Sequence, residues 1–120
     1  MMIYESSENY LECILKLTAK TGAVRAIDIV RETGYAKPSI SVAMKKLREN
    51  GYIETDAEQH ISLTESGRAI AERIYERHKV LTELLISFGV SPDTAENDAC
   101  RIEHDISDET FDAVKRHMEE

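Results

Sequence analysis

The spacing of hydrophobic and polar residues in the first fifty positions predicts three helices. The first is predicted over about residues 7–20, with Ser6 or Ser7 as its cap. A second is predicted over 26–33, directly before a glycine, the residue that most often follows a helix end. A third is predicted over 38–49, because proline is favoured in the first helical turn. Two short helices joined by a tight turn are typical of a helix-turn-helix.

The pattern then changes from helical to extended and back to helical. Two short apolar runs at 52–55 and 60–63 flank a polar stretch and predict a β-hairpin, which after a helix-turn-helix is a wing. The remaining helices are predicted at 65–87 behind a Thr64 cap, at 92–105, and from Ser107 onward. The predicted fold is mainly α with a small β-hairpin wing: a winged helix-turn-helix domain over 1–68 and a helical domain over 69–120.

Length and composition narrow the function classes. The 120 residues are too few for most barrel or doubly wound enzymes, so we expect no enzyme. No apolar run approaches the roughly 18 residues of a membrane span, and the N-terminus has no signal-peptide pattern, so we expect a cytoplasmic protein without a membrane partner. The net charge of −8 argues against DNA binding, but residues 90–120 hold ten of the 23 acidic residues and only three basic ones.

The third predicted helix carries a local basic face. Outside its apolar stripe it presents lysine, serine and small apolar side chains, which suit phosphates, base edges and thymine methyl groups. Alone, such a face is usually just solvated. A preceding helix, a tight turn and a following wing favour DNA binding instead. The candidate DNA-binding residues are Lys37, Pro38, Ser39, Ser41, Val42, Lys45 and Lys46.

The helix predicted at 92–105 carries a candidate metal-binding face. Glu96, Cys100, Glu103 and His104 follow one another at i, i+4, i+7 and i+8, which places a thiol, two carboxylates and an imidazole on one side of a helix. A divalent cation would neutralise these acids and take further ligands from other helices. The candidates for those are Glu12, with Asn9 and Glu8 nearby, and His78.

Together these segments resemble the metal-dependent repressors that include the diphtheria toxin repressor, other iron-dependent regulators and the manganese transport regulators. The matching stretches are 8–12, 24–29, 63–68, Arg77-His78 and, most specifically, 98–109. The resemblance implies a homodimer that binds an inverted-repeat operator in double-stranded DNA when loaded with Fe(II) or Mn(II) and represses metal-uptake genes. Co(II), Ni(II) and Zn(II) are expected to bind in vitro. The helical domain is then the metal-binding and dimerisation domain. From the residues, the expected dimer surface is the apolar side of the helices at 92–105 and 107–118, with Leu84, Leu85 and Phe88.

The resemblance also implies a ligand set. Cys100, Glu103 and His104 match the principal site of the iron-type members, His78 matches a ligand of both branches, and Glu12 matches a ligand of the manganese branch. Asn9 stands where the manganese branch has aspartate, and Glu96 stands where the iron branch has a histidine ligand, so both are further candidates. Thr82 replaces a glutamate ligand of the iron branch, and Ala26 replaces the usual Ser or Thr helix cap.

Two other functions remain open from the residues. A winged-helix regulator could sense a small organic molecule, or nothing, without any metal. A thiol redox sensor would use Cys100 as its reactive group, but Cys13, the second cysteine, lies among apolar residues and is expected in the core. Catalysis by Cys100 and His104 is the weakest hypothesis, because one helix face supplies neither an oxyanion site nor a substrate pocket.

Overall fold

The computed structural model describes residues 5–120. The chain divides into two compact units, residues 1–72 and 73–120. The boundary predicted from the sequence lies four residues earlier, between 68 and 69. None of the helices within the described residues combines the length and the apolar character that crossing a bilayer requires.

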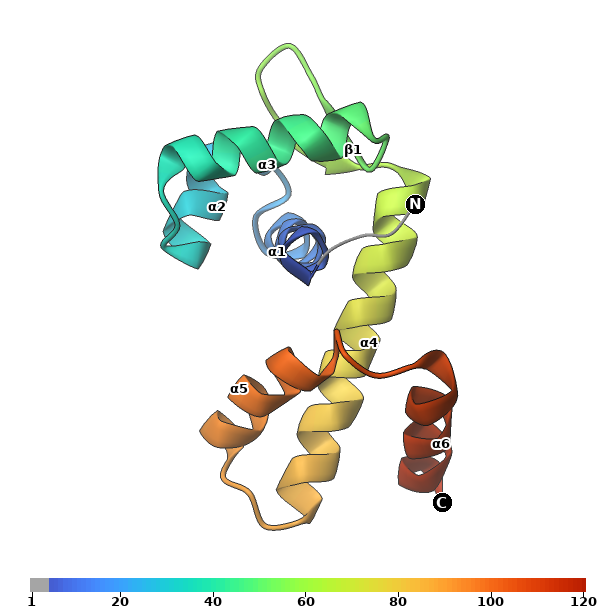
Figure 1. The fold of residues 1–120 in the computed structure, drawn as a ribbon. Helices are drawn as coiled ribbons and strands as arrows, with labels where there is room; N and C mark the ends of the chain where they lie inside the picture. The colour runs from blue at the N-terminus through green and yellow to red at the C-terminus, as the bar shows by residue number, and fades with distance from the viewer. Residues whose placement is uncertain (1–4) are drawn as a thin grey trace. The chain divides into compact units, whose positions relative to one another are not determined.

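The first unit holds the predicted helix-turn-helix and wing (Figure 1). Its elements are α1 (Glu5–Thr21), α2 (Ala26–Thr33), α3 (Lys37–Glu49), β1 (Ile53–Thr55), β2 (Ile61–Leu63) and the start of α4 (Glu65–Ser87). Because α1 already includes Glu5, the predicted cap at Ser6 or Ser7 is wrong, and both serines lie inside the helix. Gly34 has the expected left-handed backbone (φ 76°) and donates its N–H to Val30, which ends α2.

The core of the first unit is an apolar cluster drawn from every element. Leu11 and Ile14 of α1, Ile29 of α2 and Ile40 of α3 are fully buried. The wing joins this cluster through Ile53 and Ile61, one from each strand. Burying large aliphatic side chains removes apolar surface from water, at about 1.5–3 kcal/mol each. This cluster therefore fixes the position of α3, whose remaining faces are exposed.

The wing is tied at its base to the start of α4. Its strands pair antiparallel, with Glu54 opposite Ser62. Thr64 caps α4 as predicted: its hydroxyl accepts from the Gly67 N–H at 3.2 Å and donates to the Gly51 carbonyl at 2.7 Å. A Cβ on Gly67 would lie 2.0 Å from the Tyr52 carbonyl oxygen, so only glycine allows this close approach.

The second unit consists of the remainder of α4, α5 (Pro92–Ile102) and α6 (Asp108–Glu119). Ser107 caps α6 by accepting the Thr110 N–H. The α5 prediction ran to residue 105, whereas the helix ends at Ile102 and a turn follows. Few large apolar side chains are buried in this unit, whereas two charged side chains are buried. Its buried residues are Ile74, Arg77, Leu81, Ala95, Ala99, Glu103 and Phe111.

Candidate metal centre and DNA-binding face

A buried carboxylate lies between two imidazoles in the second unit. The Glu103 side chain is fully buried, and its Oε2 lies 2.9 Å from Nδ1 of His78 on α4. Its Oε1 lies 3.4 Å from Nε2 of His104, whose side chain is 1% exposed. A charged carboxylate is costly to bury unless positive charge and hydrogen bonds compensate it. Each oxygen of the Glu103 carboxylate therefore lies beside one imidazole nitrogen.

The end of α5 decides which of its predicted ligands are buried. Ala95, Ala99 and Glu103 form the buried row, spaced four residues apart. Glu96 and Cys100 each follow one residue later, and both are exposed on α5. Glu103 caps the helix and His104 lies in the turn beyond it, so the four predicted residues do not share one continuous helix face. The structure brings together His78, Glu103 and His104.

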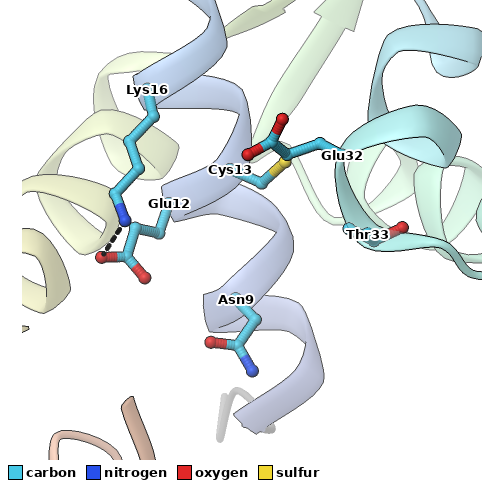
Figure 2. Close-up of a pocket in the computed structure, with 6 residues that line it drawn as sticks. All are labelled: Asn9, Glu12, Cys13, Lys16, Glu32 and Thr33. Carbon is cyan, nitrogen blue, oxygen red and sulfur yellow. Dashed lines mark ion pairs between the residues drawn. The ribbon is translucent and has the colours of Figure 1, made fainter. Parts of the chain in front are cut away.

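The other predicted ligands lie on α1 in the first unit. Asn9 and Glu12 line a cavity of about 170 Å³ between α1 and α2, and Glu12 Oε2 lies 3.5 Å from Nζ of Lys16 (Figure 2). That oxygen accepts no hydrogen bond within the described part of the chain. Cys13, on the side of α1 that faces Glu32, also lines this cavity. Burial, and then the charge of Glu32, raise the pKa of the Cys13 thiol to about 11.

Sequence reasoning missed Arg77, which holds the turn that carries Glu103 and His104. Its Nη1 donates to the carbonyl oxygens of Glu103 (3.1 Å) and Ile106 (2.8 Å), and its Nη2 bonds to the Asp108 carboxylate. A signal was available, because Arg77 falls between Ile74 and Leu81 on the inward side of an amphipathic helix. A charged residue in an apolar stripe indicates a buried polar partner.

The basic side of α3 is open to solvent. Ile40, Met44 and Leu47 face the core. The predicted DNA-binding residues Lys37, Pro38, Ser39, Ser41, Val42, Lys45 and Lys46 are all exposed. Between α3 and the wing lies a groove of about 310 Å³, and its lining adds Arg48, Thr55 and Gln59 to this surface. In the sequence, Arg48 lies close to the lysines of the third helix. The sequence gives no comparable sign that the wing residues Thr55 and Gln59 belong to this surface.

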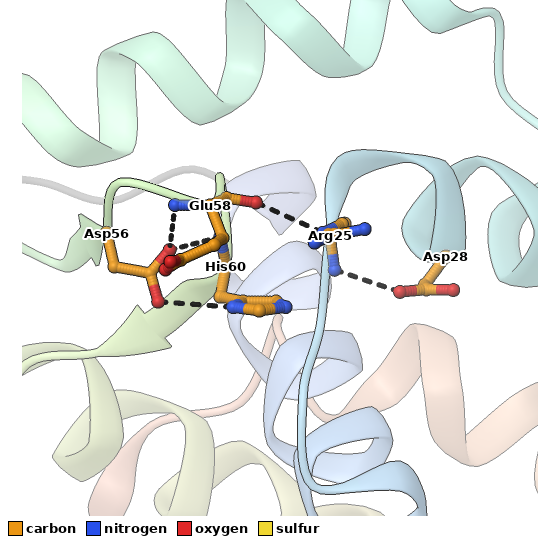
Figure 3. A network of polar contacts seen from close by, with 5 residues as sticks. All are labelled: Arg25, Asp28, Asp56, Glu58 and His60. Atoms are coloured by element: carbon orange, nitrogen blue, oxygen red, sulfur yellow. Dashed lines mark hydrogen bonds and ion pairs between the residues drawn. The ribbon is translucent and has the colours of Figure 1, made fainter.

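The tip of the wing is held by a polar network (Figure 3). Asp56 accepts the N–H groups of Glu58 (2.9 Å) and His60 (2.8 Å), and it pairs with the His60 ring at 3.1 Å. These bonds, led by the one from the His60 N–H, lower the pKa of Asp56. Arg25, which precedes α2, donates from Nε to the Glu58 carbonyl at 3.1 Å. The network therefore fixes the wing tip against the start of the helix-turn-helix.

Comparison with known proteins decides the family. Residues 2–61 match the family description "Iron dependent repressor, N-terminal DNA binding domain". Residues 64–120 match "Iron dependent repressor, metal binding and dimerisation domain". The transcriptional regulator MntR of Escherichia coli O6:H1 is 33% identical over 111 residues, which cover 92% of this chain and 72% of that protein.

The chain belongs to the iron-dependent repressor family, a family of metal-dependent, DNA-binding transcriptional regulators.

Solved structures of similar regulators agree in fold. The manganese regulator SloR superposes with a TM-score of 0.85 at 22% identity, over 94% of this chain and 53% of that one. A manganese-dependent transcriptional repressor in complex with manganese gives a TM-score of 0.81 at 25% identity, over 92% of this chain and 51% of that one. This chain thus spans about half the length of these structural relatives.

The buried donors of this iron-dependent repressor chain fit a divalent metal ion. First-row divalent cations accept imidazole nitrogen and carboxylate oxygen together, which are the atoms that His78, His104 and Glu103 present. Their burial also suits an ion, because a cation would neutralise a carboxylate that water does not reach. All three donors lie in the stretch that matches the metal-binding domain of the family.

Proposed function

We propose that this chain is a homodimeric, metal-responsive repressor that binds an operator in double-stranded DNA when it is loaded with Fe(II) or Mn(II). Family membership supports DNA binding, metal binding and dimerisation, and the relatives named above are transcriptional regulators. We propose that the protein acts in the cytoplasm, and that it works by binding DNA and metal rather than by catalysis. The observation that carries it is the fully buried Glu103 carboxylate between the imidazoles of His78 and His104.

The proposed ligands come from three stretches of chain. His78, Glu103 and His104 would hold the ion from the second unit, with Cys100 as a further donor. Glu12 of α1 would complete the shell, and Asn9 and Glu96 are additional candidates. When bound, the ion supplies positive charge that neutralises the buried carboxylates. With ligands from both units, the metal would bind only to some of their relative positions. Binding would then raise the population of those positions without changing the fold of either unit.

The choice of metal follows from the donors. Imidazole and carboxylate accept Fe(II) and Mn(II), a thiol such as Cys100 favours Fe(II), Co(II), Ni(II) or Zn(II), and availability in the cell decides among them. The relative solved in complex with manganese supports Mn(II) as a ligand of this fold. We propose repression of metal-uptake genes, because a repressor that binds DNA in its metal-loaded form closes a feedback loop on uptake.

The proposed DNA contact is the exposed side of α3. Its lysines, Lys37, Lys45 and Lys46, would pair with phosphates, while Ser39, Ser41 and Val42 would meet base edges in the major groove. A second copy of the chain would provide the matching half-site, about one helical turn (roughly 34 Å) or a multiple of it away. Ile86 and Phe88 are exposed to 43% and 69% at the end of α4 and offer an apolar surface for dimerisation.

A metal-titrated DNA-binding assay tests the proposal. We expect Mn(II) or Fe(II), added to chelated protein under anaerobic conditions, to tighten binding to an inverted-repeat duplex, and chelator to reverse it. The substitutions His78→Gln and Cys100→Ala should weaken the metal response. The matched control, His117→Gln, changes an exposed histidine of α6 and should leave it intact. Metal-independent DNA affinity in the parent would instead support a metal-free winged-helix regulator.

A further inference from the structure

Arg77 is a charged side chain in the apolar stripe of α4. It is 5% exposed, and the apolar residues Ile74 and Leu81 lie before and after it in the same buried row. The guanidinium also lies over the Phe111 ring of α6, 5.4 Å from the ring centroid. Its position immediately before His78 places it next to a proposed metal ligand along the chain.

Within residues 5–120, the side-chain hydrogen bonds of Arg77 go to the turn after α5 and to the first residue of α6. Two of its acceptors are backbone carbonyls, of Glu103 and Ile106, 26 and 29 residues away in sequence. The third is the Asp108 carboxylate at the start of α6. Because a guanidinium presents its donors in one rigid plane, three acceptors bound to it are fixed relative to one another. The turn that carries Glu103 and His104 therefore has its geometry set from α4.

Stability alone does not account for a buried arginine at this position. Its Nε is buried and donates no hydrogen bond within residues 5–120, and its partner carboxylate on Asp108 is 77% exposed. An ion pair between a buried arginine and an exposed carboxylate is weak evidence for stabilisation, since even fully buried ion pairs can often be replaced by apolar side chains of similar size. What an apolar side chain cannot do is hold two carbonyls and a carboxylate at fixed positions.

We propose that Arg77 is a positioning residue for the metal centre: it holds the turn after α5 so that the Glu103 carboxylate lies beside the imidazoles of His78 and His104. The inference rests on the proposed function, because it concerns the same metal site. Arg77 itself ligates nothing. It acts through the backbone of Glu103, and its effect is on the affinity and geometry of metal binding. Groups that orient metal ligands in this way typically change affinity by about 10- to 100-fold when they are removed.

The test compares Arg77→Met and Arg77→Lys with the parent chain in three measurements. These are the Mn(II) dissociation constant, the visible absorption spectrum of the Co(II)-loaded protein, and the thermal unfolding of the metal-free protein. We expect Arg77→Met to bind Mn(II) about 10- to 100-fold more weakly, with an altered Co(II) spectrum. Arg77→Lys keeps the charge but not the planar set of donors, so it should recover only part of the affinity.

A matched control separates positioning from general packing between α4 and α6. Lys115 of α6 forms an ion pair with Glu76 of α4 at 3.2 Å, and this pair does not involve the turn after α5. Glu76 is the residue immediately before Arg77. The substitution Lys115→Met breaks this link and should leave the Mn(II) affinity and the Co(II) spectrum unchanged. If Lys115→Met weakens metal binding as much as Arg77→Met does, the specific role of Arg77 is refuted.

The remaining outcomes distinguish this inference from the proposed function. Failure of the parent chain to bind Mn(II) and Co(II) refutes the metal centre itself. A parent that binds metal, beside an Arg77→Met protein with the same affinity and spectrum, overturns only the role of Arg77. Should Arg77→Met fail to fold, Asp108→Asn replaces it as the test variant. This substitution weakens one of the hydrogen bonds of Arg77 and changes only an exposed side chain. A loss of Mn(II) affinity of about tenfold, the lower end of the range for groups that orient metal ligands, then supports the inference, and no change overturns it.

Discussion

The two units of this chain bury apolar and charged side chains in different proportions. In the first, aliphatic side chains from all three helices and both wing strands form one cluster, among them Leu11, Ile29 and Ile40. Among the described residues, each unit also buries two charged side chains, Glu8 and Glu12 in the first and Arg77 and Glu103 in the second, but the second buries fewer large apolar residues with them. Apolar burial is non-directional and mainly gives stability, whereas a buried guanidinium gives direction. The first unit is built to hold α3 firmly, and the second to hold donor atoms in place.

The largest effect should come from truncating the core of the first unit. Ile40 of α3 is fully buried, so Ile40→Ala should lower the free energy of unfolding by about 2–5 kcal/mol. Val42, two residues along the same helix and 55% exposed, is the control: Val42→Ala should change stability by about 0.5 kcal/mol or less and alter DNA affinity instead. Urea unfolding measures both. Equal losses from the two substitutions would contradict the division of α3 into a core face and a DNA face.

A smaller effect is expected from metal on the second unit. Mn(II) at about 100 times its dissociation constant should add about 2.7 kcal/mol to the free energy of unfolding, because it binds only the folded chain. The substitution Glu103→Gln removes the buried charge, so this increase should disappear. Ile40→Ala, by contrast, should keep it. Thermal unfolding with and without Mn(II) measures the difference, and an undiminished increase in Glu103→Gln would remove Glu103 from the ligand set.

The smallest effect concerns the chemical reactivity of the Cys13 thiol. Its pKa is raised to about 11, so the reactive thiolate is scarce at pH 8 and becomes tenfold more abundant with each pH unit toward 11. In a Cys100→Ser background, the rate of iodoacetamide modification should follow this rise. Modification of Cys13 at the rate of an ordinary thiol at pH 8 would contradict the pKa and revive the hypothesis of a thiol redox sensor.

Much of the fold could be predicted from sequence because its signals are local. The left-handed Gly34 after α2 and the Thr64 cap before α4 each act within a few residues, and both helix boundaries agree with the prediction. The end of α5 could not be predicted in this way. No glycine or proline marks it, and the carbonyls of Glu103 and Ile106 bond to Arg77 of another helix instead.

The candidate site was predicted in composition but not in arrangement. Residue types and the family resemblance named His78, Glu103 and His104, which the structure brings together. The expected helix face differs from the structure in two ways: α5 stops before Glu103 and His104, and Glu96 and Cys100 each lie one residue after the buried row of Ala95 and Ala99 and are exposed. Periodicity assumes that a helix continues. A tertiary hydrogen bond that ends it is invisible in a local window of sequence.

The turn after α5 also bears on how this centre can evolve. The backbone of Glu103 and Ile106 is held by a guanidinium from another helix, while positions 96 and 100 remain on the solvent side of α5. Substitutions at exposed helix positions usually cost about 0.5 kcal/mol or less. In the proposed metal centre, mutation could therefore exchange the donor atoms at positions 96 and 100 at little cost in stability while Glu103 and His104 stay unchanged.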